Sequence, residues 1–594
     1  MPKLERAVLL LTLGSALTGA ACKKASEPGT PVAPTTDVTP AVATPAKSTT
    51  ATDGPAVGDL RKVGRVDFKI SCDGQQAQFD RAMALLHSFF YGESRRLFTE
   101  LTTKDPDCSI AHWGVAMTYY HPLWAPPTPE ELASGRAAIE KAKAAPKKSP
   151  HETTFIDALA TFYTDMPAPK PGAGSAAGSA GGMSCHGPTG GGDHLTRATT
   201  YTMAMEKVFA ANPEDTEAAS FYALALLGSA KPVDPTLTNP RKAAEILEKQ
   251  WATHRDHPGV AHYMIHAYDF PPLAERGLEV AKAYADIAPW VPHALHMPSH
   301  IFVRLGMWQD SINGNLASAD AGKKYVTEMK LDGMSFEELH ALDYLVYAYL
   351  QTGQEAKAKA VVEHVMSVKK TVPEIDFVAS YAVGAVPARF AVERHAWAEA
   401  AALTVPTASF WTKFPFAEAH IEYARGLGRA RSGDIAGAEK SLARLTELRD
   451  LTNDPKFAYF KQHLALQHQA VTAWLTQAKG KSADAIAALR KAAQMEEELG
   501  KNPVSPGPIN LIYEQLGDLL LQLDKPAEAI VAYETALKTS PRRLNSLLGA
   551  GLAAQKAGKA DVARKYYEQA VEQTAAGDST RPEIAAARAF VAKK

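Results

Sequence analysis

The apolar residues of this 594-residue chain rarely alternate with polar residues in the two-residue period of a β-strand. Alanine, the strongest helix former, is abundant in nearly every segment. The pattern therefore predicts α-helix along nearly the whole chain. Because a single hydrophobic core usually stops growing at about 250 to 300 residues, we expect several cores or one long continuous core.

A pattern of small and aromatic residues recurs near the C-terminus. Gly517, Ala529, Tyr533 and Ala536 return thirty-four residues later as Gly551, Ala563, Tyr567 and Ala570. This is the pattern of the tetratricopeptide repeat (TPR), in which small residues let two antiparallel helices approach closely and the aromatic residue fills the gap to the next repeat. One repeat cannot bury its apolar face alone, so repeats stack. We predict an all-α TPR superhelix, or α-solenoid, of roughly ten helix-turn-helix repeats.

Composition divides the predicted solenoid into segments. A stretch rich in Gly, Ala and Ser interrupts the helical pattern, and we expect it to be disordered. The expected segments are N-terminal TPR-like repeats (67–165), the Gly-rich insertion (166–195), central histidine-rich repeats (196–405) and C-terminal TPR repeats (406–580).

The N-terminus has the features of an export signal over residues 1–22. Lys3 and Arg6 precede an apolar run that is too short to span a bilayer, and "GAAC" ends this segment at Cys22. Cys22 is the expected lipidation site of a lipobox-like sequence, and ordinary cleavage after Ala21 is the alternative. Residues 23–66, rich in Pro, Thr and Ala, are expected to form a disordered tether. Either processing route places the mature chain in the periplasm or the outer cell envelope.

An oxidising compartment favours disulfides. Cys72 and Cys108 lie just before the first and third predicted helices, which neighbouring repeats bring together. We therefore predict a Cys72–Cys108 disulfide. Cys185 lies in the Gly-rich insertion and is expected to be free.

The central repeats are rich in histidine. His262 and His266 are spaced i,i+4 on one predicted helix, and His296 and His300 occupy the equivalent positions thirty-four residues later. Since the first helices of adjacent repeats lie side by side, four imidazole nitrogens could converge on one ion in the concave groove. The surrounding polar strip contains His293, Asp269, His340 and Asp343. His87 and His121, also thirty-four residues apart, extend the histidine lining of the groove.

Neutral imidazole is a good ligand for Zn, Cu and Fe, so this arrangement predicts a transition-metal site. Asp269 or Asp343 would be a fifth ligand or would accept the second ring N–H of a ligating histidine. Two alternatives remain open. The same strip could bind an organic or peptide ligand, or the histidines could be structural members of a buried hydrogen-bond network.

Charge and motifs exclude several function classes. The formal net charge is −1, with 64 basic and 65 acidic residues and no basic block suited to phosphate, so nucleic acid is not an expected partner. The chain has no G-x-S-x-G elbow, no Gly-rich phosphate loop and no Cys–His nucleophile pair. No enzyme class is therefore indicated.

Several segments together resemble a family of exported bacterial TPR proteins of uncharacterised function. They are "LLHSFFY", "AHWGVAMTYYHPLW", "HYMIHAYD", "PHALHMPSHIFVRLGMW" and "NPVSPGPINLIYEQLGDLLL". The resemblance covers roughly residues 68 to 575 and implies a fold and an extracytoplasmic compartment, but no mechanism. Two hypotheses follow: a metal-binding protein, or an adaptor for an envelope protein or peptide that contacts the membrane only through its lipid anchor.

Overall fold

The computed structural model describes most of the chain from residue 62 onward. The described residues are 62–123, 126–164, 183–184, 187–188, 192–230, 234, 236–374, 376–406, 413–500 and 504–593. The predicted signal peptide with Cys22, nearly all of the tether, and Cys185 lie outside them. No helix among the described residues is long and apolar enough to cross a membrane.

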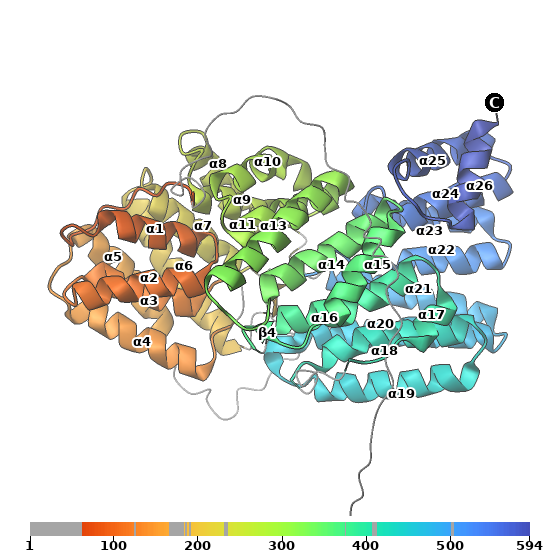
Figure 1. Cartoon of the computed structure of the whole chain (residues 1–594), viewed down its shortest axis with the longest axis horizontal. Helices are drawn as coiled ribbons and strands as arrows, with labels where there is room; N and C mark the ends of the chain where they lie inside the picture. Colours follow the sequence, from red (N-terminus) through yellow and green to blue (C-terminus); the bar gives the residue numbers. More distant parts are fainter. Residues whose placement is uncertain are drawn as a thin grey trace, which may run out of the picture. The chain divides into compact units, whose positions relative to one another are not determined.

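Successive antiparallel helix pairs build the structure, and Figure 1 shows them coloured along the chain from α1 in red to α26 in blue. In the first half the helices are α1 (Gln76–His87), α2 (Tyr91–Lys104), α3 (Ser109–Tyr120), α4 (Pro129–Ala144), α5 (Pro150–Tyr163), α6 (Gly192–Ala211), α7 (Thr216–Gly228), α8 (Thr238–Trp251), α9 (Pro258–Tyr268), α10 (Leu278–Ile287), α11 (Pro292–His296), α12 (Pro298–Leu305) and α13 (Trp308–Glu328). A short 3-10 helix, Ala274–Gly277, precedes α10.

The second half continues the same arrangement. Its helices are α14 (Phe336–Gln351), α15 (Glu355–Met366), α16 (Phe377–Glu393), α17 (Trp397–Ala402), α18 (Pro415–Arg431), α19 (Ile435–Leu451), α20 (Ala458–Ala478), α21 (Ser482–Leu499), α22 (Ile512–Gln522), α23 (Pro526–Thr539), α24 (Leu544–Lys556), α25 (Ala560–Gln573) and α26 (Pro582–Ala592), with a 3-10 helix at Pro455–Phe457. Each helix contacts its neighbours in sequence, as expected for an α-solenoid.

Strands are minor among the described residues. β1 (Met183–Ser184) pairs antiparallel with β2 (Gly187–Pro188), and β3 (Met334–Ser335) pairs parallel with β4 (Thr371–Val372). The predicted all-α solenoid is therefore confirmed.

The repeat signature has the packing role that its spacing predicted. Tyr533 and Tyr567 are buried, and a Cβ atom on Gly517 or Gly551 would lie within 2.7 Å of the ring of Tyr533 or Tyr567 respectively. Only a residue without a side chain lets the ring lie this close to the helix backbone.

Two predicted segment boundaries differ from the ordered parts of the structure. Val63 and Val66 are buried, and Arg65 N–H donates to the Asp256 carbonyl at 2.9 Å, although the tether was expected to run to residue 66. Helix α6 begins at Gly192, within the predicted Gly-rich insertion.

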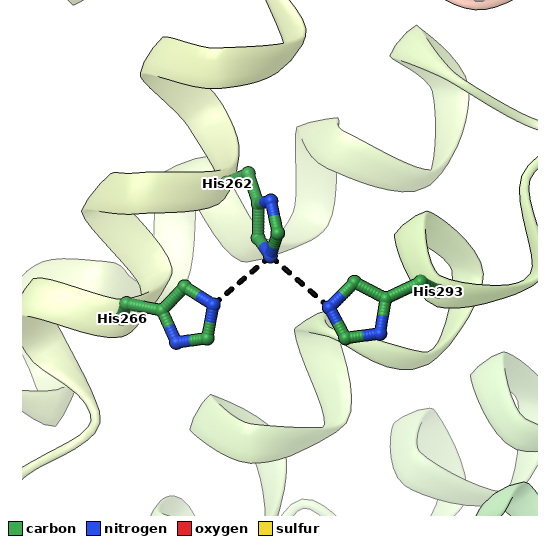
Figure 2. A group of neighbouring side chains, drawn as sticks. All are labelled: His262, His266 and His293. Carbon is green, nitrogen blue, oxygen red and sulfur yellow. Dashed lines mark hydrogen bonds between the residues drawn. The ribbon is translucent and has the colours of Figure 1, made fainter. Parts of the chain in front are cut away.

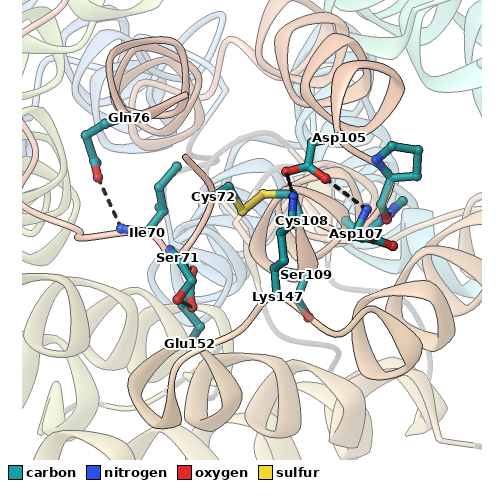
Figure 3. Close-up of a disulfide and its surroundings, with 12 residues drawn as sticks. Ile70, Ser71, Cys72, Gln76, Asp105, Asp107, Cys108, Ser109, Lys147 and Glu152 are labelled. Atoms are coloured by element: carbon teal, nitrogen blue, oxygen red, sulfur yellow. Dashed lines mark hydrogen bonds and ion pairs between the residues drawn. A yellow bond between two sulfur atoms is a disulfide. The ribbon is translucent and has the colours of Figure 1, made fainter. Parts of the chain in front are cut away.

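A disulfide joins Cys72, just before α1, to Cys108 at the start of α3, with Cα atoms 5.5 Å apart (Figure 3). This is the pair that the sequence predicted. Beside it, Ser71 N–H donates to Glu152 Oε1 at 2.9 Å. The segment before α1 is thereby attached to both α3 and α5.

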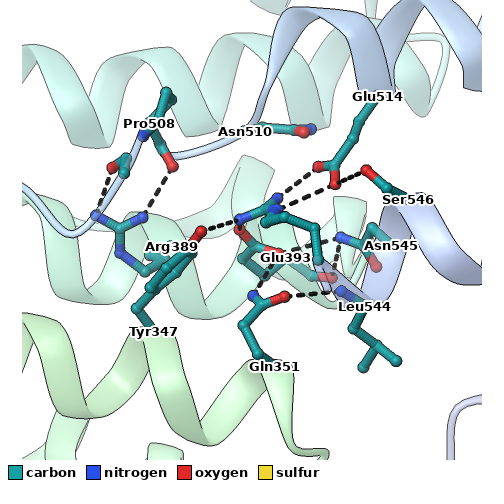
Figure 4. A network of polar contacts seen from close by, with 12 residues as sticks. Tyr347, Gln351, Arg389, Glu393, Pro508, Asn510, Glu514, Leu544, Asn545 and Ser546 are labelled. Atoms are coloured by element: carbon teal, nitrogen blue, oxygen red, sulfur yellow. Dashed lines mark hydrogen bonds and ion pairs between the residues drawn. The ribbon is translucent and has the colours of Figure 1, made fainter. Parts of the chain in front are cut away.

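A buried ionic network holds together helices that are distant in sequence (Figure 4). Arg543, at the start of α24, is fully buried and donates to Glu393 Oε1 at 2.6 Å and to Glu514 Oε1 at 3.0 Å. It also donates to the Tyr347 hydroxyl at 3.1 Å. The network connects α14, α16, α22 and α24, so it fixes how the C-terminal repeats stack on the central ones.

The apolar core has two parts that meet at the histidine-rich helices. One part extends from Val63 to Phe302 and the other from Val303 to Ala587. Helices α9, α11 and α12 belong mainly to the first, and α14 belongs to the second. The histidines therefore lie in a polar layer between two apolar cores.

Candidate metal centre

Proline and glycine residues set the bounds of the helices that contribute the histidines. Pro258 and Pro292 lie in the first turns of α9 and α11, where a missing N–H is tolerated. Pro298 separates α12 from α11, and Gly306 ends α12 in the left-handed conformation at φ +67°. These helices place His293 and His296 on α11 and His300 on α12.

The first trio consists of His262 and His266 on α9 and His293 on α11, and its ring nitrogens point toward one another (Figure 2). His262 Nε2 lies 3.0 Å from His266 Nε2 and 3.2 Å from His293 Nε2. Two nitrogens bound to one tetrahedral zinc at about 2.0 to 2.1 Å would lie about 3.3 Å apart. The separations are thus close to those of ligands around an ion.

The second trio consists of His296, His300 and His340, from α11, α12 and α14. His296 Nε2 and His300 Nε2 are 3.1 Å apart, and the His340 ring centroid lies 4.2 Å from that of His296. Each residue of the trio offers one nitrogen, and these nitrogens lie within 4.8 Å of one another.

The prediction that His262, His266, His296 and His300 converge on one ion is wrong in its grouping. The i,i+4 pairs are correct, but each pair is completed by a histidine from the following helix of the stack: His293 for the first, His340 for the second. The physical reason is that the two histidines of α11 reach different helices: His293 contacts His262 on α9, and His296 packs against His340 on α14.

Hydrogen bonds at Nδ1 determine where the ring protons lie. His262 Nδ1 is 2.6 Å from the His87 carbonyl, and His300 Nδ1 is 2.9 Å from Asp269 Oδ2. A carbonyl and a carboxylate only accept, so both Nδ1 atoms carry hydrogen. His296 Nδ1 lies 2.7 Å from Asn315 Oδ1, whose amide is oriented by donating from Nδ2 to the Ser311 carbonyl.

The consequence is that lone pairs face one another in the second trio. With hydrogen on Nδ1, the neutral rings of His296 and His300 direct unprotonated Nε2 atoms at each other across 3.1 Å. Two acceptors at this distance repel unless a cation lies between them. A metal ion supplies that cation, and outer hydrogen bonds of this kind are typical of metal-ligating histidines.

Burial keeps His262 and His266 in the neutral form that binds metal. All six histidines of the trios are between 0% and 3% exposed. Burial lowers the pKa of His262 to about 3, and burial together with the charge of His262 lowers the pKa of His266 well below its ordinary value. Neither ring therefore has to lose a proton to bind an ion at neutral pH.

The two carboxylates predicted near the metal have different roles. Asp269 accepts from His300 and also from Arg304 Nε at 2.8 Å, as the predicted outer partner of a ligating ring. Asp343 lies one turn beyond His340 on α14 and instead accepts from the buried Arg389 on α16 at 3.2 Å. Its predicted place in the histidine cluster is therefore wrong, because the next repeat provides a stronger partner.

The histidines predicted to line the concave groove are instead buried. The connection between α1 and α2 covers the first trio, with the Phe89 ring centroid 4.4 Å from His262 and 5.7 Å from both His266 and His293. Phe89 has a φ of +55°, an uncommon conformation for an aromatic residue. The centre is thus an interior site, and sequence spacing could not reveal its cover.

A third buried group contains two histidines and one carboxylate. His87 Nε2 lies 2.8 Å from Glu217 Oε2, and His257 Nε2 lies 3.0 Å from Glu217 Oε1. His257 Nδ1 accepts from Val260 N–H, and His87 Nδ1 lies 3.0 Å from the Tyr263 hydroxyl. Sequence analysis missed His257 and Glu217; the position of His257 just before Pro258, as a helix cap, was the available signal.

Two further histidines predicted to line the groove, His87 and His121, lie outside the trios and have other partners. His87 belongs to this third group, which we call the His87–Glu217–His257 network. His121 Nε2 lies 3.4 Å from Glu131 Oε1.

A family model described as "Tetratricopeptide repeat" matches residues 514–589. The chain therefore contains tetratricopeptide repeats. This match covers the same repeats in which glycine and tyrosine recur at a thirty-four-residue spacing. Searching curated proteins by sequence finds no match.

Three solved structures are among those to which the chain is similar. A tetratricopeptide repeat protein from Parabacteroides merdae ATCC 43184 is 13% identical, with 51% of this chain and 99% of that chain covered at a TM-score of 0.29. The P58(IPK) TPR domain is 14% identical, with 87% and 98% covered at 0.20. The human IFIT1 dimer with m7Gppp-AAAA is 13% identical, with 79% and 90% covered at 0.34. At these identities and TM-scores, no ligand or partner of those proteins is assigned to this chain.

Proposed function

We propose that this TPR protein binds two transition-metal ions, one in each histidine trio. The observation that carries the proposal is the convergence of three ring nitrogens in each trio, together with the Nδ1 hydrogen bonds of His262, His296 and His300, which hold the protons of these rings on the far side. Three imidazoles leave at least one coordination position for water or for a ligand atom, as in sites of the His₃ type. Zn, Cu and Fe all accept such ligands.

Metal analysis of the full-length chain, without an affinity tag of histidines, tests this proposal. We expect about two equivalents of transition metal per chain after dialysis against buffer. A chelator should remove the metal and lower the melting temperature, because a ligand that binds only the folded state stabilises it. Absence of retained metal, with no change in melting temperature on adding Zn, Cu or Fe, would contradict the proposal. One equivalent would show that only one trio binds.

We further propose that the protein works outside the cytoplasm, attached to a membrane through Cys22. The support is the short apolar run that ends in "GAAC", since an acylated cysteine with several buried CH₂ groups gives stable membrane attachment. Cys22→Ala should move the protein from the membrane fraction to the soluble fraction. Unmutated protein found wholly in the soluble fraction would favour ordinary cleavage after Ala21.

A second candidate function is an adaptor that binds an envelope protein or peptide without metal. The specific observation in its favour is the tetratricopeptide match over residues 514–589, since solenoid repeats present extended surfaces to protein partners. Metal content separates the two candidates: the adaptor needs none.

A further inference from the structure

An aromatic cavity of about 610 Å³ lies against the first trio, a volume typical of small-molecule sites. Phe89, Tyr325, Phe336, Phe377 and Phe457 form much of its wall. Phe89 is shared between the two sites, because its ring also contacts His262, His266 and His293. A molecule in the cavity would therefore be separated from the histidines by one side chain.

Glu337 is the second residue that connects the cavity to the trio. It lines the cavity, and its Oε2 lies 3.9 Å from His293 Nδ1. The residue is 2% exposed, yet neither carboxyl oxygen has a hydrogen-bond partner among the described residues. A buried polar group without a partner is destabilising, so a ligand that hydrogen bonds to Glu337 would gain affinity.

The other charged groups of the cavity wall have partners within the protein. Arg95 donates to the side chain and the carbonyl of Thr118 at 3.0 and 2.9 Å. Lys456 pairs with Asp454 at 3.0 Å.

The remaining charges are matched in the same way. Glu131 pairs with His121 at 3.4 Å, and Asp376 accepts from Ala379 N–H at 2.9 Å as a helix cap. Glu337 is thus the acidic side chain of the described wall that a ligand would satisfy. Burial and the nearby Asp376 raise its pKa to about 8, and a cation beside it would lower that pKa and stabilise the carboxylate.

We propose that this cavity binds an organic amine, with its ammonium group against Glu337 and its apolar body against the aromatic rings. Ammonium N–H groups would donate to the two carboxyl oxygens, and aromatic faces attract cations. A carboxylate ligand would not stabilise the ionised form of Glu337, and a purely apolar ligand would leave its oxygens without partners. The proposal depends on the cavity and on Glu337, and it does not require metal in the trios.

Three probes with one ring system and different charges test the proposal. Calorimetric titration of the full-length chain would use 2-naphthylmethylamine, 2-naphthalenemethanol and 2-naphthoate. We expect the amine to bind most tightly and the carboxylate least. Equal binding of all three, or tightest binding of the carboxylate, would overturn the proposal.

Substitutions locate the binding site. Glu337→Gln should weaken amine binding by about 10- to 100-fold and bring it close to that of the alcohol. The matched control is Glu338→Gln: Glu338 is the next residue on α14, pairs with His364 at 2.7 Å and lies outside the cavity wall. Unchanged amine affinity in Glu337→Gln would contradict the proposal.

A second variant keeps the proposal testable if Glu337→Gln does not fold. Phe457→Leu keeps the wall apolar but removes one aromatic face, so the amine should lose more affinity than the alcohol. Equal losses for both probes would contradict the role of the rings. Titrations before and after chelator treatment separate this proposal from the metal proposal. If the chain binds the amine but never holds metal, only the metal proposal is refuted.

Discussion

The His87–Glu217–His257 network and the two trios are all buried groups of histidines. They differ in whether an acceptor for the ring N–H groups lies inside the group. In the network, one carboxylate faces two ring nitrogens, and Val260 N–H is accepted by the remaining nitrogen of His257. In the trios, nitrogen faces nitrogen at 3.0 to 3.2 Å. The network is complete as it stands, whereas the facing Nε2 atoms of His296 and His300 repel each other unless a cation lies between them.

The difference shows that clustering of histidines is not by itself a sign of metal binding. All three groups have ligating atoms within 4.8 Å of one another. What distinguishes them is the presence of an acceptor inside the group. Although burial alone would raise it, the pKa of Glu217 is held well below its ordinary value by His87 and His257, so this carboxylate stays ionised and accepts from both rings.

The largest expected effect is loss of metal when a trio histidine is removed. Loss of an outer hydrogen-bond partner alone lowers metal affinity by about 10- to 100-fold, so His296→Ala should lower it by more than about 100-fold at the second trio. His262→Ala should do the same at the first. His257→Ala, in the network, is the control and should retain both ions by elemental analysis. Loss of metal in His257→Ala would contradict the distinction between the network and the trios.

The next effect is on stability. Glu217→Leu should lower the free energy of unfolding by about 3 to 5 kcal/mol, because two buried imidazole N–H groups lose their acceptor. Metal content should not change. Urea denaturation of the metal-free protein would measure this, and a loss below about 1 kcal/mol would show that the network is not structural.

A smaller effect should follow from removing the hydrogen bond that orients a ligating ring while the ring itself is kept. Asn315→Leu deletes the acceptor for His296 Nδ1 and should lower metal affinity at the second trio by about 10- to 100-fold, leaving the first unchanged. Asn313→Leu, on the exposed face of α13, is the matched control. Competition with a metal-binding dye would report the affinity of each site.

The smallest effect is a pH dependence specific to the network. Because the folded-state pKa of Glu217 is depressed, its stabilisation is fully present above its ordinary value of 4.5 and is lost as the pH falls below 4.5 toward the folded-state value. The stability difference between the unmutated protein and Glu217→Gln should therefore be constant from pH 7 to 5. It should then shrink by up to about 1.4 kcal/mol per pH unit below 4.5. Melting temperatures across this range would test it; a difference that grows in acid would contradict it.

The sequence by itself determined the local features of this protein. Helical composition and the thirty-four-residue spacing predicted the solenoid, and Gly517 with Tyr533 predicted a close helix contact that the structure contains. The i,i+4 spacing also placed His262 beside His266 and His296 near His300, because each pair lies within one or two turns of chain. Asp269 was predicted beside the histidines from the same repeat alignment, either as a fifth ligand or as an outer partner.

Only the tertiary structure decided which histidines share a site and what covers them. His262 Nδ1 donates to the carbonyl of His87, 175 residues earlier, and Phe89 packs over the first trio from the same connection. Glu217 joins two histidines that lie 130 and 40 residues away, and Arg389 pairs with Asp343, which was expected near the metal. Repeat periodicity describes contacts between neighbouring helices. It contains no information about which distant segment supplies a hydrogen-bond acceptor. In a buried site, that acceptor determines which ring nitrogen of a histidine carries the hydrogen, and therefore whether the ring presents an N–H group or a lone pair to its neighbours.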